Sequence, residues 1–417
     1  MLYYLARPIA RYVLRYYYRH IDITGLENIP TNGPVIFAAN HPTAFIEPCI
    51  LACFQERELH FLARGDLFKN RLATWALHRL HILPVFRLQD GGYGKLKENY
   101  QTFAACNRAL SAGKAVMILA EGRCIHEKRL RQIRKGTGRI ALSSLAADPN
   151  LSDIPIVPIG VNFTHPDKMR STVMIRCGAP LSTRQYLADY QQTENIGVRK
   201  LTDDLRKALS PLVIQIPSRE QDDLAEAIFT LSRSNYRMPL VHGLTYDGQL
   251  LDRELAQVQA LPQNSQPILA YFNRLAQFDL TDASVAGVYD QALNRSVWGW
   301  CKTVLAAFLL LWHLPVWWLS ELIGGTTHRL IEFYSPVRFA AIAIGMVVYP
   351  FLWLIGLQPL LIVYALGALV GVRWAWREWE ATQQWYQARA AWRQIPSERQ
   401  YLQTLRKNAL DSLAIAE

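Results

Sequence analysis

Two long stretches without charged side chains, near the C-terminus, constrain this chain more than any other feature. The first, 303–320, contains His313 but no Asp, Glu, Lys or Arg, and the second, 339–372, contains no charged residue at all. A helix needs about 20 predominantly apolar residues to cross a bilayer, so the first stretch is just long enough and the second more than long enough. We expect Pro350 and Pro359 to break the second stretch, which then forms one tilted span, two spans or a re-entrant hairpin.

Basic residues on the C-terminal side of these stretches indicate an orientation. Residues 297–372 are predicted to form membrane-embedded helices, and residues 373–417 a basic tail that stays in the cytoplasm. The first 20 residues lack the cleavage pattern of a secretory signal, so we expect the upstream part in the cytoplasm too. The sequence therefore predicts a protein of the inner or cytoplasmic membrane whose active site faces the cytoplasm. A buried helical hairpin in a soluble domain is the alternative.

The N-terminus predicts an amphipathic helix over residues 1–21. Arg7, Arg11, Arg15 and Arg19 recur every four residues and so follow one side of a helix, beside tyrosine, leucine and valine side chains. Such a helix can lie on an anionic bilayer, with membrane lipids as its partners. A soluble helix packed on the following domain would show the same pattern.

The composition argues against two classes of protein. Hydrophobic residues make up 51% of the chain and charged residues 19%, which is incompatible with a largely disordered protein. The net charge of +11 suits an anionic partner, but no pattern typical of nucleic-acid binding accompanies it, so lipid is favoured. The six cysteines are scattered without a CxxC pair, so we expect reduced thiols, no metal site and no cofactor.

Residues 22–182 alternate between strand-like and helix-like segments, which is typical of an α/β sheet flanked by helices. Short apolar runs predict strands at 35–39, 115–120, 154–163 and 171–178, and helical spacing occurs at 95–112 and 139–147. Residues 183–296 are polar, rich in Gln and Leu, and helical in spacing. We therefore predict an α/β domain over 22–182 and a helical connector over 183–296.

A histidine followed by an acid marks the end of the first predicted strand. His41 comes after VIFAAN, and Glu47 lies six residues further on, past a proline that suits the start of a helix. A histidine with a nearby carboxylate is the minimum for general base catalysis, because the carboxylate orients the ring and stabilises the imidazolium that forms. A histidine that caps the helix, with Glu47 in solvent, is the structural alternative.

Two further segments carry groups suited to a phosphate. The strand-like run HILPVFR ends in Arg87, whose guanidinium can bind phosphate through two hydrogen bonds, although a surface ion pair would also explain it. The run ILAEG passes through Glu121 and Gly122 into a basic stretch that includes Lys135 and precedes a helix. Glycine permits close approach of the backbone to a ligand, and free N–H groups at a helix start favour anions. A solvated basic loop is the alternative.

The order of these segments is more specific than any one of them. An Asn-His with an acid a few residues on, a strand ending in Arg, a Glu-Gly turn with a basic stretch and a Val-Pro strand follow one another within residues 22–182. In this the chain resembles the glycerol-phosphate and lysophosphatidate acyltransferases, and its C-terminal extension is similar to a bacterial and fungal subgroup of them. The chain differs from the common family pattern in having Glu47 for an Asp, Ala120 for a Pro, and Cys124 in the third segment.

The resemblance implies transfer of a fatty acyl group from a thioester, acyl-CoA or acyl carrier protein, to a hydroxyl of glycerol 3-phosphate or lysophosphatidate. His41, oriented by Glu47, would be the general base, and no acyl-enzyme would form. Backbone N–H groups near the His41 turn would stabilise the developing oxyanion.

The same resemblance assigns substrate-binding roles to Arg87, Lys135, Glu121 and Gly122. The two cations would hold the acceptor phosphate, and the Glu-Gly pair would position the glycerol hydroxyls or the turn itself. Because Glu47 is unusual, a membrane lipid-binding protein that has kept the fold and lost the activity stays open as the alternative. The sequence does not specify the acceptor, the acyl length or the donor.

Overall fold

The computed structural model describes residues 2–68, 70–85, 98–235, 243–262, 264–286, 296–326, 330–354, 359–394 and 396–414. The chain divides into two compact units. The first comprises Met1–Ile214, Leu244–Gly248 and Ile323–Ala343, and the second comprises Gln215–Gly243, Gln249–Leu322 and Ile344–Glu417. The expected boundary between 182 and 183 thus lies inside the first unit, because the helix that follows it shares a core with the sheet.

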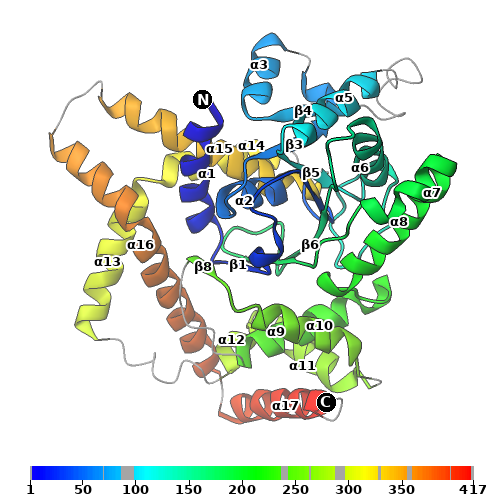
Figure 1. Cartoon of the computed structure of the whole chain (residues 1–417). Helices are drawn as coiled ribbons and strands as arrows, with labels where there is room; N and C mark the ends of the chain where they lie inside the picture. Colours follow the sequence, from blue (N-terminus) through cyan, green and yellow to red (C-terminus); the bar gives the residue numbers. More distant parts are fainter. Residues whose placement is uncertain are drawn as a thin grey trace. The chain divides into compact units, whose positions relative to one another are not determined.

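An eight-stranded sheet is the centre of the first unit (Figure 1). Its strands in chain order are β1 (His20–Thr24), β2 (Val35–Ala39), β3 (Leu59–Arg64), β4 (Ile82–Val85), β5 (Ala115–Leu119), β6 (Ile156–Phe163), β7 (Thr172–Cys177) and β8 (Gly243–Thr245). Their order across the sheet is β4-β3-β5-β2-β6-β7-β1-β8. The strands from β4 to β6 run parallel, whereas β7 pairs antiparallel with β6. The α/β class and the four strands expected from apolar runs are confirmed.

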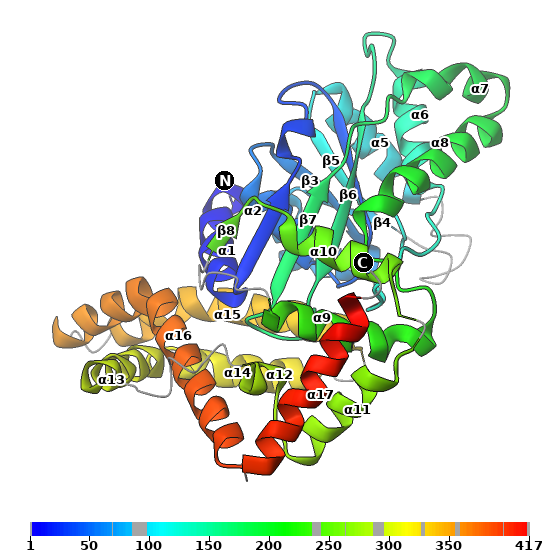
Figure 2. The same cartoon turned by 90° about the horizontal axis from the view of Figure 1, so that it is seen from below.

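Helices cover both faces of this sheet. On one face, α5 (Glu98–Ser111), α6 (Gly136–Ala147) and α8 (Glu194–Leu209) share a buried apolar cluster with β2, β5 and β6. On the other side lie α1 (Leu2–Tyr17) and α2 (Ile46–Phe54) (Figure 2). A short α3 (Arg71–Arg79) connects β3 to β4, and α7 (Leu187–Gln192) precedes α8. β2 and β6 are buried along their whole length, as expected of central strands with helices on both faces.

The N-terminal helix α1 forms, but it ends at Tyr17 rather than at residue 21, so Arg19 lies outside it and residues 20–21 belong to β1. Part of the helix is a packed element of the first unit. Its buried residues are Tyr3, Val13, Leu14, Tyr16 and Tyr17. On the other side, the guanidinium groups of Arg11 and Arg15 lie over the ring of Phe54 in α2, at 5.4 and 5.9 Å from its centroid. The helix therefore packs on the domain, and its contact with a bilayer stays a prediction.

The described part of the second unit consists mostly of helices. They are α9 (Asp222–Asn235), α10 (Gln249–Gln259), α11 (Gln266–Gln277), α12 (Asp282–Val285), α13 (Val297–Leu311), α14 (Leu314–Gly325), the second half of α15 (Ile331–Leu354), α16 (Pro359–Trp392) and α17 (Pro396–Ala414). The helical character expected of 215–286 is thus observed in the residues that the structure describes.

One helix in the described residues, Ile331–Tyr349 within α15, is long and apolar enough to cross a membrane. The pair α13 and α14, bent by 60°, would be a second if it forms one broken span. α15 continues past Pro350 to Leu354, so that proline does not end the helix as expected, whereas α16 begins at Pro359 as predicted. A helix of this kind is weak evidence for a membrane, because core helices of soluble proteins share its composition.

A segment after α8 packs so closely on β6 that it requires a glycine. The side chain of Asn162 donates to the carbonyl of Leu212 and accepts from the N–H of Ile214, each at 2.9 Å. A Cβ at Gly160 would lie 2.1 Å from the carbonyl oxygen of Leu212. The strand and this segment can therefore pack only if residue 160 has no side chain.

We expect Gly160→Ala to destabilise the first unit by about 3 kcal/mol, because overpacked cores must shift their backbone. The measurement is the urea midpoint of the purified protein. Gly136→Ala is the matched control, since a Cβ there would meet nothing within 4 Å, and its midpoint should stay close to that of the wild type. Equal midpoints for the two variants would contradict the close packing.

Candidate active site

The candidate catalytic residues emerge from two neighbouring strands at the same edge of the sheet. β2 and β5 are parallel and in register, with Ala39 opposite Leu119. The pairing continues past both strands, since the N–H of Ala120 donates to the carbonyl of Ala39 at 2.8 Å. His41 and Glu121 therefore leave the sheet side by side at its carboxyl edge, where open α/β sheets bind their ligands.

The side chain of Asn40 continues the hydrogen bonding between β2 and β6 beyond the end of β2. Its amide group donates to the carbonyl of Val161 at 2.9 Å and accepts from the N–H of the same residue at 2.7 Å. The side chain thus takes the place of the next peptide group of β2 and leaves the main chain free to turn away. This turn directs His41 out of the sheet.

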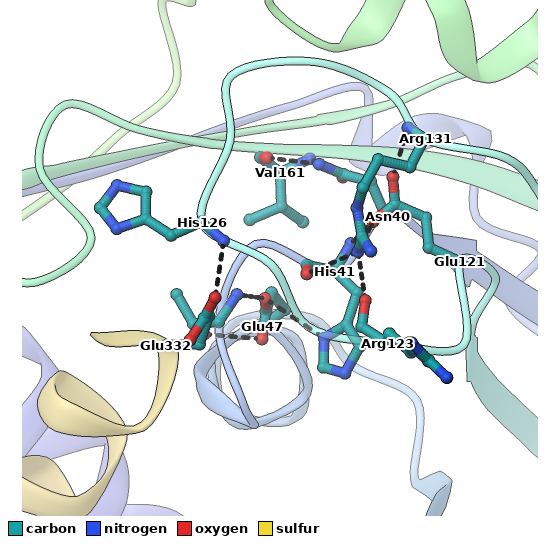
Figure 3. Close-up of polar contacts among 10 residues, drawn as sticks. Asn40, His41, Glu47, Glu121, Arg123, His126, Arg131, Val161 and Glu332 are labelled. Carbon is teal, nitrogen blue, oxygen red and sulfur yellow. Dashed lines mark hydrogen bonds and ion pairs between the residues drawn. The ribbon is translucent and has the colours of Figure 1, made fainter. Parts of the chain in front are cut away.

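His41 and Glu47 lie beside each other, as the hypothesis of a general base requires (Figure 3). Nδ1 of His41 is 3.7 Å from Oε1 of Glu47. Both residues are buried, with exposed fractions of 6% and 0%. The contact is longer than a hydrogen bond, and catalytic contacts are often long before substrate binds. A small movement of the ring would let Nδ1–H donate to the carboxylate, which leaves Nε2 as the base.

Glu47 is fixed by a threonine that the sequence analysis did not select. Oε1 of Glu47 accepts the N–H of Thr43 at 2.6 Å, and Oε2 accepts the Thr43 hydroxyl at 2.9 Å. Glu47 also lies in the first turn of α2, where the partial positive charge of a helix start stabilises a carboxylate. The expected helix begins at Ile46 rather than next to His41, so residues 41–45 form a turn that Glu47 closes.

Glu121 holds this turn from the other side. Its Oε2 accepts the N–H of His41 at 2.9 Å and the Arg131 guanidinium at 2.7 Å, and its Oε1 accepts the N–H of Arg131 at 2.8 Å. The Arg131 guanidinium also donates to the carbonyls of His41 and Arg123. Both oxygens of Glu121 are therefore engaged by protein donors, which favours its role in positioning the turn over a role in binding glycerol hydroxyls.

The remaining predicted substrate-binding residues have different surroundings. Gly122 has φ +70°, a left-handed conformation that favours glycine, and it turns the chain from β5 into the basic loop. Lys135 is exposed and stands directly before α6, which begins at Gly136 rather than at Arg139. Arg87 lies outside the described residues.

Backbone N–H groups of the His41 turn do not fit the expected oxyanion site. The N–H of His41 donates to Glu121, and that of Thr43 donates to Glu47. The N–H of Ala44 donates to the carbonyl of Glu332 at 3.0 Å. Position 42 is a proline and has no N–H. The N–H groups of His41, Thr43 and Ala44 are therefore already bound, and an oxyanion site formed by other amides near the turn stays a prediction.

Cys49, which is close to Glu47 in the chain, does not have the properties of a nucleophile. Cys49 lies two residues after Glu47, and burial, followed by the proximity of Cys53 and Glu47, raises its pKa, so the thiol stays protonated. Cys124 is half-buried in the basic loop. In the part of the chain that the structure describes, no group of three or more His, Cys, Asp or Glu side chains is arranged to hold a metal ion.

A polar groove of about 270 Å³ lies away from these residues. It is lined by segments that precede β2, β3 and β5, among them Gly33, Arg57 and Lys114. Because these strands are parallel, the groove is at their amino ends, opposite His41. The guanidinium of Arg57 is already bound to the carbonyls of three loop residues, so it holds the loops together.

Thr43, Arg131 and Glu332 are the site residues that sequence reasoning missed. Thr43 precedes Glu47 by four residues, close to the spacing of a capping box, and could have been found by that signal. Arg131 is one of several cations in its loop, and nothing in the sequence distinguishes it. Glu332 lies far along the chain and has no local signal.

The site thus combines an open α/β sheet with a buried histidine that lies beside a carboxylate at the carboxyl edge of the sheet. Residues 20–162 match the family model described as Acyltransferase. This match confirms the resemblance seen in the sequence.

Curated relatives match parts of the chain. A glycerol-3-phosphate O-acyltransferase of Saccharomyces cerevisiae is 23% identical over 183 residues, which are 42% of this chain and 24% of that protein. An uncharacterised acyltransferase of Schizosaccharomyces pombe is 25% identical over 297 residues, 51% of this chain and 44% of that protein. The chain therefore spans less than half the length of these relatives. The crystal structure of the 1-acyl-sn-glycerophosphate acyltransferase of Thermotoga maritima matches 49% of this chain and 79% of its own, with 15% identity and a TM-score of 0.36.

Proposed function

We propose that the protein transfers a fatty acyl group from a thioester to a hydroxyl of glycerol 3-phosphate or lysophosphatidate. The observation that carries the proposal is the buried His41 beside Glu47, in a domain that matches the acyltransferase family model. The name of the yeast relative supports a glycerol-phosphate acceptor. Acyl-CoA and acyl carrier protein are the two donors that suit this chemistry.

The reaction needs one base and no covalent enzyme intermediate. The acceptor hydroxyl gives its proton to Nε2 of His41 while its oxygen attacks the thioester carbonyl. The negative charge of Glu47 stabilises the imidazolium that forms. The tetrahedral intermediate then breaks its carbon–sulfur bond, and the leaving thiolate takes the proton from His41. The products are an ester and a free thiol, and His41 returns to its neutral form.

Cations of the basic loop are suited to the acceptor phosphate and to the oxyanion. Arg123 and Lys135 are exposed, so their charged groups are accessible to an anion. From the family resemblance we further assign Arg87 to the phosphate. Since three amides of the His41 turn are bound elsewhere, we propose a cation of this loop as the group that stabilises the oxyanion.

The membrane is the expected place of reaction. An acyl chain gains about 0.8 kcal/mol per buried CH₂ in a bilayer, so substrate and product both partition there. The apolar helix Ile331–Tyr349 supports a membrane association. We place the active site and the basic C-terminal tail both in the cytoplasm, which requires an even number of membrane crossings, or none, between them.

Mass spectrometry of lipid products tests the proposal. The purified protein in detergent or vesicles is given acyl-CoA or acyl carrier protein as donor and a panel of acceptors. The panel contains glycerol 3-phosphate, dihydroxyacetone phosphate, lysophosphatidate and a lysolipid without a free phosphate monoester. We expect a new ester of a phosphate-bearing acceptor, formed at least about tenfold faster than in the absence of enzyme. Binding of lipids without turnover of any acceptor would instead favour a lipid-binding protein.

A further inference from the structure

The first turn of α15 contacts the catalytic turn directly. The backbone carbonyl of Glu332 accepts the N–H of Ala44 at 3.0 Å, and Oε1 of Glu332 accepts the N–H of His126 at 3.3 Å. Figure 3 shows the hydrogen bond between the His126 N–H and the Glu332 carboxylate. All four residues belong to the first compact unit, which includes α15 as far as Ala343. The start of the apolar helix is therefore part of the site.

These two hydrogen bonds join two different loops. Ala44 lies in the turn 41–45 that carries the proposed base, whereas His126 lies in the basic loop 122–135. The loops also contact each other where the N–H of Ile125 donates to the carbonyl of His41 at 3.2 Å. Glu332 binds both loops at once, and its carboxylate is the part that reaches the basic loop.

A separate contact anchors the same helix turn to the domain. The hydroxyl of Tyr17, at the end of α1, is 2.7 Å from the hydroxyl of Ser335, and both groups are buried. The position of Glu332 is therefore set by an interaction that does not involve either loop. This separation allows the anchoring of the helix and the holding of the loop to be tested one at a time.

We propose that Glu332 is a positioning residue, which holds the basic loop against the catalytic turn and so fixes its cations for the acceptor phosphate. The role of the loop in binding the acceptor phosphate rests on the proposed function, whereas the holding of the loop by Glu332 does not. A carboxylate suits the task because hydrogen bonds to charged acceptors are about twice as strong as neutral ones. Loss of the carboxylate removes the hydrogen bond to the His126 N–H and loosens the part of the loop around His126, while His41 and Glu47 keep their own bonds.

Amide hydrogen exchange of the full-length protein tests this inference without a substrate. In Glu332→Ala, exchange within residues 122–127 should rise roughly tenfold, which corresponds to the loss of one hydrogen bond to a charged group. Glu332→Gln keeps an acceptor oxygen and should stay near the wild type. Amides of β2 and β5 should be unchanged in both variants. Equal exchange in Glu332→Ala and wild type would overturn the proposal, as would an equal rise throughout the sheet.

Enzyme kinetics distinguish two roles of this helix turn. One is to hold the basic loop through Glu332, and the other is to anchor α15 to the domain through Ser335. Glu332→Ala should raise the KM for the phosphate-bearing acceptor roughly tenfold, and much more than the KM for the thioester. Ser335→Ala removes the hydroxyl contact of the anchor but keeps the Glu332 carboxylate and the Ser335 carbonyl, to which the Tyr17 hydroxyl also donates at 3.2 Å. This variant is the control and should leave both constants near the wild type. The same acceptor defect in Ser335→Ala would mean that Glu332 acts only through helix docking. Failure of the wild type to acylate any acceptor would refute the proposed function. The hydrogen-exchange experiment needs no substrate, so it would still test whether Glu332 holds the loop.

Discussion

His41→Ala is expected to lower the rate of acyl transfer about a thousandfold, because general base catalysis contributes on the order of 10² to 10⁴ in rate. The two carboxylates of the site are not suited to replace the imidazole, because both are already bound. The Glu47 carboxylate is held by Thr43, and Glu121 is held by Arg131. The measurement is kcat with a saturating thioester and acceptor.

The fold should survive this substitution. The N–H and the carbonyl of His41 make the bonds that hold the turn, to Glu121 and Ile125, and alanine keeps both. Hydrogen exchange of the turn should therefore resemble that of the wild type. His78→Ala in α3, a histidine outside the site, serves as the matched control and should retain activity. Full activity in His41→Ala would defeat the assignment of the base.

Glu47→Gln is expected to lower kcat about a hundredfold with little change in either KM. Glutamine has nearly the same shape, and its oxygen can accept the N–H of Thr43 while its NH₂ donates to the Thr43 hydroxyl. The geometry is kept, but the negative charge that stabilises the imidazolium of His41 is lost. The variant therefore separates the charge of residue 47 from its role in closing the turn.

The control for this variant is the same substitution of a glutamate by glutamine at a position outside the candidate site. Glu194→Gln in α8 alters an exposed carboxylate and should leave kcat unchanged. If Glu47→Gln turned over as fast as the wild type, the carboxylate would have only a structural role. A large rise in KM instead of a fall in kcat would move Glu47 to substrate binding.

The parts of the fold that could be predicted are those determined by residues close together in the sequence. β2 and β5 are buried on both faces, so they are continuous apolar runs that the sequence reveals. His41 and Glu47 are six residues apart and lie on either side of one turn, so their proximity follows from a short connection. The alternation of strands and helices indicated the α/β class for the same reason.

The contacts that escaped prediction join residues far apart in the chain. Glu121 was expected at the site, but its bonds to the N–H of His41 and to Arg131 depend on how two loops fold together. A glycine is needed at position 160 because Leu212, which lies outside the predicted domain, packs directly on the strand there. Pro350 was expected to end a helix, and α15 continues through it. In each case tertiary packing outweighs the local preference.

The bonds between Glu332 and the two loops have a consequence for where the chemistry happens. If α15 crosses a bilayer, its 19-residue apolar segment is about 28 Å long at 1.5 Å per residue and matches the thickness of the hydrocarbon layer. Its first turn would then lie at the headgroup level. Because that turn is hydrogen-bonded to the loop of His41, the imidazole would be kept at one fixed depth. A long-chain thioester could then present its carbonyl to the enzyme while the rest of its tail stays dissolved in lipid.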